Sequence, residues 1–211
     1  VGLKPTVGLL SRSGIIPISS TLDTPGPMTK NVIDNALILQ AMVGYDKLDT
    51  ITNMVKSMKN DYNSIEWNSD YLKGKKIGVL TALLSDSIYK EAINKLKLAE
   101  AELLELAPEE MNYEGFLNLL TTEMKHDLPN HFKSLNNSSN TITSVEKIVN
   151  FNKKDSLLRA PYGQQLFMGI VKDTTTKEEL KAIKLKLREE GEKYFEALKQ
   201  DKVAVIVSIN N

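Results

Sequence analysis

Serine, lysine and histidine are the side chains of this sequence that could carry out nucleophilic or acid–base chemistry. Ser11 and Ser13 follow Lys4 closely, and a second serine pair stands at Ser19 and Ser20. A serine hydroxyl becomes a useful nucleophile only when a base lies within hydrogen-bond reach. The spacing does not place Lys4 against either serine pair. We therefore interpret them as turn serines that bond nearby backbone groups.

The two histidines do not have the spacing of a metal site. His126 and His131 are five residues apart on a predicted helix, whereas a helical zinc pair is four residues apart. The sequence contains no cysteine, which excludes a thiolate metal site, a cysteine nucleophile and a disulfide framework. We predict histidines that are exposed or partly buried, with no metal ligands among them.

One aspartate stands among glycine and proline in the run Asp23-Thr24-Pro25-Gly26-Pro27-Met28. An acid in so weakly charged a segment is expected to accept backbone hydrogen bonds or to pair with Arg12. The first interpretation is an aspartate that stabilises a turn. A position beside a substrate pocket is the alternative.

Secondary structure follows from the spacing of apolar residues. Glycine and proline in the first thirty residues are typical of short strands and tight turns, and a helix over 32–42 follows, capped by Thr29 and ended by Gly44. Strand 76–81, helix 88–96 and strand 102–106 form a βαβ unit with parallel strands. Further helices are expected over 113–132, where Pro129 interferes, and over 177–199, before a strand at 203–207. The fold class is α/β.

Composition narrows the classes of partner. The 211 residues carry 27 basic and 27 acidic side chains, and this balance leaves no electrostatic footprint for nucleic acid or an anionic membrane surface. The apolar run 203–207 is far shorter than the roughly 20 residues of a membrane span. No signal peptide is recognisable, so we expect a cytoplasmic protein. Because the sequence opens on Val1, we expect that it is read from the middle of something longer.

Two runs, GLKPTVGLLSRSGIIPIS (2–19) and DTPGPMTK (23–30), resemble the amidase signature family. The similarity is greatest to the bacterial branch that contains peptide amidases and cyclic-dimer nylon-oligomer hydrolases. Residues 72–79, 162–167 and 204–210 are similar to later elements of that branch, so the resemblance touches nearly the whole chain. Glu100 stands where the family's helix usually turns into its strand through glycine, and Lys30 replaces the usual arginine.

This resemblance implies a mixed, twisted sheet flanked by helices. It also implies hydrolysis of carboxylic amides by a Ser–cis-Ser–Lys triad with backbone N–H groups around the oxyanion, without metal or organic cofactor. The family's triad residues precede the Gly-Leu-Lys-Pro-Thr motif, so no residue here is assigned to catalysis. We expect 1–211 to be part of a single amidase domain that lacks the N-terminal catalytic half and the last strands. The chain alone should be inactive.

Tyr162 and Gln164 are the predicted substrate-binding residues, because an aromatic wall with an amide donor suits an amide substrate. Core packing and loop hydrogen bonding are the alternative roles. The expected partner is a small-molecule or peptide amide, with neither nucleic acid nor membrane. Exposed apolar faces at Ile15, Ile16 and the final strand predict a homo-oligomer. A non-catalytic remnant or binding module, and one component of an amidotransferase, are the alternative functions.

Overall fold

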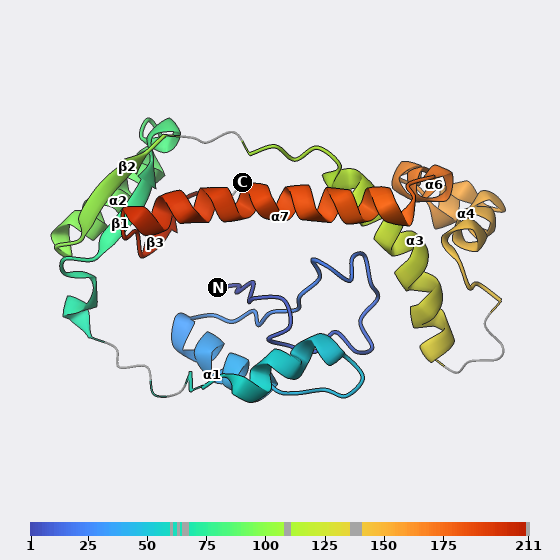
Figure 1. Cartoon of the computed structure of the whole chain (residues 1–211), viewed down its shortest axis with the longest axis horizontal. Coiled ribbons are helices and arrows are strands. Elements are labelled where there is room, and N and C mark those ends of the chain that lie inside the picture. Colours follow the sequence, from blue (N-terminus) through green and yellow to red (C-terminus); the bar gives the residue numbers. More distant parts are fainter. Residues whose placement is uncertain (60, 63, 65–67, 108–110, 136–140, 210–211) are drawn as a thin grey trace. The chain divides into compact units, whose positions relative to one another are not determined.

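The computed structural model describes the chain except residues 60, 63, 65–67, 108–110, 136–140 and 210–211. Its internal contacts divide into two compact units (Figure 1). The first unit combines Val1–Ile65 with Gly115–Ile183, and the second combines Glu66–Glu114 with Lys184–Asn211. That both units belong to one amidase domain stays a prediction.

A parallel sheet of three strands organises the second unit. Strand β1 (Lys76–Leu80) lies between β2 (Glu102–Leu106) and β3 (Val205–Val207). Helix α2 (Ser87–Leu98) connects β1 to β2, which confirms the predicted βαβ unit. The α/β class is confirmed as well. All the described strands are parallel, so the antiparallel members of a mixed sheet are not among them.

Tyr89 joins the sheet to α2 in the core of the second unit. Its fully buried hydroxyl accepts a hydrogen bond from the Leu80 amide and donates one to the Val207 carbonyl, each 2.8 Å long. Its ring packs in one cluster with Val79 and Ile93. One phenol thus links two strands to the helix while satisfying its own polar atom, as burial of a tyrosine requires.

The turn between α2 and β2 contains a strained residue. Glu100 has a φ of 58°, in the left-handed region that glycine adopts without steric cost. Its carbonyl accepts from the Gly74 amide at 2.9 Å, and its carboxylate pairs with Lys73 at 2.8 Å in an exposed position. The non-glycine residue therefore sits at a position whose backbone favours glycine, as the family resemblance suggested.

Helices and turns make up the first unit. Helix α1 (Val32–Met42) and the 3₁₀ segment η1 (Thr50–Ser57) follow the glycine- and proline-rich region, and Leu9, Leu10 and Leu39 form a core cluster there. Helix α3 (Phe116–Ser134) packs with α4 (Val145–Lys153) and α6 (Gln165–Lys172) around a second cluster of Leu128, Val145 and Ile170. The short helix α5 (Ser156–Arg159) lies between α4 and α6 in the chain. The remaining elements are helix α7 (Lys177–Gln200) and the 3₁₀ turns η2 (Ser69–Leu72) and η3 (Thr81–Leu83).

Three details of the predicted helices are wrong. Asn31 caps α1 in place of Thr29, because the Asn31 side chain accepts from the Asp34 amide at 2.8 Å. Helix α1 ends at Met42, and its C-cap Val43 has extended backbone, so Gly44 does not supply a left-handed stop. Pro129 lies inside α3, which continues to Ser134 because the core packing of its neighbour Leu128 outweighs the one backbone hydrogen bond that a proline removes. No helix among the described residues is both long and apolar enough to cross a membrane.

Candidate functional site

The turn that follows the first signature run is held by Asp23. One carboxylate oxygen, Oδ2, accepts from the Ile18 amide at 2.8 Å and from the Ser19 amide at 2.9 Å. The Asp23 amide in turn donates to the Ser19 carbonyl at 2.9 Å. The prediction that this aspartate stabilises a turn through backbone hydrogen bonds is confirmed.

Two acids of α3 hold the next part of the same turn. Glu123, only 3% exposed, accepts from the Thr21 amide at 3.1 Å, from the Thr21 hydroxyl at 2.6 Å and from the Ser19 and Ser20 hydroxyls. Asp127 accepts from the Ser20 amide at 2.9 Å. Together with Asp23, these carboxylates bind four consecutive backbone N–H groups, those of residues 18–21. Charge-assisted bonds of this kind fix the turn more firmly than neutral ones do.

Sequence reasoning did not identify Glu123 and Asp127 as partners of the turn. They are four residues apart on a predicted helix, so both project from one face. That spacing was an available signal that two acids act on the same surface. Nothing in the sequence linked that surface to residues 18–21, which lie about a hundred positions earlier.

Arg12 pairs with Asp49, not with Asp23. Its Nη2 and Nε atoms donate to the two oxygens of Asp49 at 2.8 and 2.9 Å, and its amide donates to Oδ2 at 2.9 Å. Nη1 donates to the Ser20 carbonyl at 2.6 Å. The side-chain hydrogen bond from Arg12 lowers the pKa of Asp49 against the opposing effect of burial. This fork geometry is the bidentate arrangement for which arginine is suited.

A close contact between two backbones explains why the second signature run has glycine at position 26. A Cβ atom at this position would lie 1.8 Å from the Leu3 carbonyl oxygen. The two runs lie side by side here in an antiparallel arrangement, with the Leu3 amide donating to Pro27 at 3.1 Å and the Thr29 amide donating to Val1 at 2.9 Å. The close approach of the two backbones leaves no room for a side chain.

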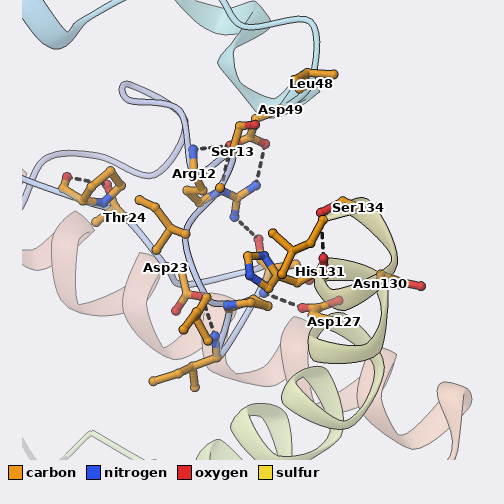
Figure 2. A pocket seen from close by; sticks show the side chains of 18 residues that line it. Arg12, Ser13, Asp23, Thr24, Leu48, Asp49, Asp127, Asn130, His131 and Ser134 are labelled. Carbon is orange, nitrogen blue, oxygen red and sulfur yellow. Dashed lines mark hydrogen bonds and ion pairs between the residues drawn. The ribbon is translucent and has the colours of Figure 1, made fainter. Parts of the chain in front are cut away.

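These elements surround a cavity of about 820 Å³ in the first unit (Figure 2). In Figure 2, Asp127, Asn130, His131 and Ser134 lie on helix α3, and the Arg12–Asp49 pair comes from other segments of the unit. Asp23 also lines the cavity, so the alternative interpretation of a position beside a pocket holds together with the turn role. The lining combines polar side chains with the apolar ones of Ile15, Ile16, Pro17, Ile18, Pro25, Leu48 and Leu135.

Ser11 and Lys4 of the signature run bond to other groups and not to each other. The Ser11 hydroxyl donates to Asp46 at 2.6 Å, and the Lys4 ammonium donates to the Pro5 carbonyl at 3.3 Å. No lysine is among the described residues that line the cavity. The Ser11 hydroxyl also accepts from the Ser13 amide, and the Ser19 hydroxyl accepts from the Leu22 amide, each at 3.1 Å, as expected of turn serines. The prediction is incomplete, because the hydroxyls of Ser11 and Ser19 donate to carboxylates far along the chain. No Ser–Lys pair occurs among the described residues that line the cavity.

Of the two histidines and the two predicted binding residues, His131 alone lines the cavity. His126 is exposed and His131 is half-buried at the cavity, and no group of three or more potential metal ligands occurs in the described part of the chain. Tyr162 is 99% exposed. Gln164 accepts from the Asn152 side chain at 3.0 Å and donates to the Val149 carbonyl at 3.4 Å. Neither Tyr162 nor Gln164 lines the cavity, and their substrate-binding role stays a prediction.

Solved structures place this arrangement in the class of amidase folds. An amidase family protein from Bacillus anthracis matches with a TM-score of 0.85 and 34% identity, over 95% of this chain and 40% of that chain. The native peptide amidase from Stenotrophomonas maltophilia matches with a TM-score of 0.67 and 30% identity, over 85% of this chain and 38% of that one.

Sequence relatives agree with the structural class. A glutamyl-tRNA(Gln) amidotransferase subunit from Clostridium acetobutylicum is 42% identical over 114 residues, which are 51% of this chain and 23% of that protein. The corresponding protein from Halothermothrix orenii is 40% identical over 103 residues, 49% of this chain and 21% of that protein. The Amidase family model matches residues 1–208. The chain belongs to the amidase family, and it spans less than a quarter of the length of these curated relatives.

Proposed function

We propose that this chain forms one wall of the substrate cavity of an amide hydrolase. The observation that carries the proposal is the signature turn, fixed by three carboxylates at the edge of a cavity of about 820 Å³. A cavity of this size with an apolar lining and a few fixed polar groups suits a small-molecule or peptide amide. The substrate class, a bacterial origin and a cytoplasmic location are part of the proposal.

The chemistry itself requires groups that the described serines and lysines do not provide. In the family mechanism, a serine attacks the amide carbonyl, the amine leaves with a proton that came through the Lys–cis-Ser pair, and water then releases the acid. The family places that triad ahead of the Gly-Leu-Lys-Pro-Thr motif. We propose that the chain without such a segment has no amidase activity, and that no metal or cofactor takes part.

A two-part assay tests this proposal. The purified chain is incubated with an amino acid p-nitroanilide and a C-terminal peptide amide, and separately with a fluorophosphonate label. We expect neither turnover nor labelling. Co-expression with the segment that precedes the matched region in the Bacillus anthracis protein should restore turnover and place the label on that segment. A stably assembled pair without turnover, or stoichiometric labelling of this chain alone, contradicts the proposal.

A non-catalytic binding module is the second candidate. Two departures from the family pattern favour it: Glu100 has a left-handed backbone conformation at a position where the family usually has glycine, and Lys30 replaces the usual arginine. Calorimetry with a peptide amide distinguishes the two candidates. The binding module is supported if the chain alone binds the peptide amide, and if co-expression with the triad segment neither changes the affinity nor produces turnover.

One component of an amidotransferase is the third candidate, since the curated relatives described above carry that function in their names. The Pro-Ile-Ser and Gln-Gln-Leu-Phe runs favour the peptide amidase branch. Release of ammonia from free glutamine by the co-expressed pair, with no cleavage of a peptide amide, would support the amidotransferase instead.

Self-association of the isolated chain is part of the proposal. Ile15 and Ile16 are exposed at the cavity, and Val205 is exposed on β3. Apolar side chains that are exposed in this way on each unit favour association in water. Light scattering that gives a monomer, together with no binding of an apolar dye, contradicts it.

A further inference from the structure

Among the described helices of eight or more residues, α1 has the most apolar exposed side. Its inner side is fixed by Asn35, whose side-chain amide donates to the carbonyls of Val1 at 3.3 Å and Pro27 at 3.1 Å. Leu39, one turn further on, belongs to the core. The inner side of α1 is therefore fully packed within the first unit.

The outer side of α1 is apolar as well. Ile33 is 51% exposed and Leu37 is 50% exposed, and Ala41 continues this line one turn later, opposite Asn35 and Leu39. All residues of α1 are described, and among its exposed residues Asp34 alone is polar. A helix that is apolar on both sides is typical of a buried position between two layers.

Helix α2 provides the contrast within the same chain. Its exposed side carries charged residues, including the pair Glu91–Lys95 at 2.8 Å, as expected of a helix that faces water. Exposed apolar residues occur elsewhere in the chain, Ile88 and Leu98 of α2 among them, but on α1 they make up the whole exposed side except Asp34.

We infer that the outer side of α1 is the docking surface for the part of the amidase fold that this chain does not span. The Bacillus anthracis amidase family protein supplies the argument for this occupant, because 95% of this chain matches only 40% of that one at a TM-score of 0.85. That fold therefore contains a large additional portion, which could pack against the apolar outer side of α1. The inference rests on the proposed function in taking an amidase segment as the occupant.

The test co-expresses this chain with the unmatched portion of the Bacillus anthracis protein and measures co-purification, the dissociation constant and amide turnover. The variant is the double substitution Ile33→Lys/Leu37→Lys. Leu157→Lys/Leu158→Lys on α5 is the matched control, since these leucines of the same unit are 89% and 76% exposed. Circular dichroism and thermal melting of each isolated variant confirm that it folds like the wild type.

We expect the wild type and the α5 control to bind equally, and the α1 variant to bind at least about a hundredfold more weakly. Two apolar side chains removed from an interface each reduce affinity by about tenfold or more. The inference is overturned if the α1 variant binds as tightly as the wild type, or if the wild type forms no complex. It is also overturned if the α1 substitutions abolish self-association of the chain and leave the complex unchanged. An α1-dependent complex without turnover supports the docking surface and contradicts the proposed hydrolase. Turnover that is insensitive to the α1 substitutions supports the hydrolase and contradicts the docking surface.

Discussion

Glu123 is the residue whose replacement tests the site most directly. Its carboxylate is buried and accepts hydrogen bonds from Ser19, Ser20 and Thr21. Glu123→Ala leaves the Ser19 hydroxyl and the Thr21 amide without an acceptor. Each unsatisfied buried group costs roughly 1–3 kcal/mol, so we expect the free energy of unfolding to fall by about 3 kcal/mol. For a chain of this length, that loss lowers Tm by about 6–12 °C.

Glu123→Gln should reduce stability less than Glu123→Ala, because the amide keeps one acceptor oxygen and the volume of the original side chain. Its NH₂ group, however, faces hydroxyls that must turn to accept a hydrogen bond. We expect a loss of about 1–2 kcal/mol, which places this variant between the wild type and the alanine variant in stability. Glu105, exposed on β2, is the control, and its substitution by alanine or glutamine should change Tm by no more than about 2 °C.

Hydrogen exchange separates a local effect from general destabilisation. The Thr21 amide should exchange faster in Glu123→Ala, because its acceptor is the carboxylate that has been removed. The Ile18 amide, held by Asp23, should change less under conditions where the native state predominates. A loss of stability below about 1 kcal/mol in Glu123→Ala, with unchanged exchange at Thr21, refutes the structural role assigned to this carboxylate.

Three further predictions concern backbone strain, close packing and pH. Glu100→Gly should be more stable than Glu100→Ala by about 1 kcal/mol in urea unfolding, because a φ of 58° disfavours any Cβ; equal stability contradicts this. Gly26→Ala should lower Tm by more than about 6 °C, since its Cβ would lie 1.8 Å from a carbonyl oxygen, whereas Gly44→Ala, with open space, should not. Because the hydrogen bond from Arg12 lowers the pKa of Asp49, this group stabilises the fold above the pKa of an unfolded aspartate, and the contribution is lost as pH falls through the folded value. Asp49→Asn should therefore flatten the loss of stability below about pH 4, and parallel curves for variant and wild type contradict this.

The regular elements were predictable because their apolar spacing is local. The strand at 102–106 and the helix at 32–42 have the predicted bounds, and the parallel pairing of β1 with β2 follows from the helix between them. The cap of α1 was less predictable, since Thr29 and Asn31 are both suitable capping residues in sequence. The outcome depends on which side chain reaches the Asp34 amide, and that is a matter of geometry within one turn.

The cavity was only partly predictable because its parts come from distant segments. Asp23 was identified from its glycine- and proline-rich surroundings, and its hydrogen bonds are made within five residues. The partner of Arg12, by contrast, lies 37 positions away, and the contacts from Glu123 to the turn span more than a hundred. Local pattern carries no information about such pairs. The sequence predicted the turn and its own aspartate, Asp23, but not that Glu123 and Asp127 bind the same turn.

The signature runs establish the family of this chain more firmly than its activity. Their glycine at position 26 is required by a backbone contact, and Asp23 is required by a turn. Lys4 and Ser11 engage a backbone carbonyl and a carboxylate, respectively, so the motif's own lysine and first serine serve the fold. A sequence can therefore keep every residue of this motif for structural reasons while the nucleophile lies elsewhere. For that reason an activity measured on this chain becomes informative only when it is compared, in the same assay, with the chain assembled on a segment that contains the triad.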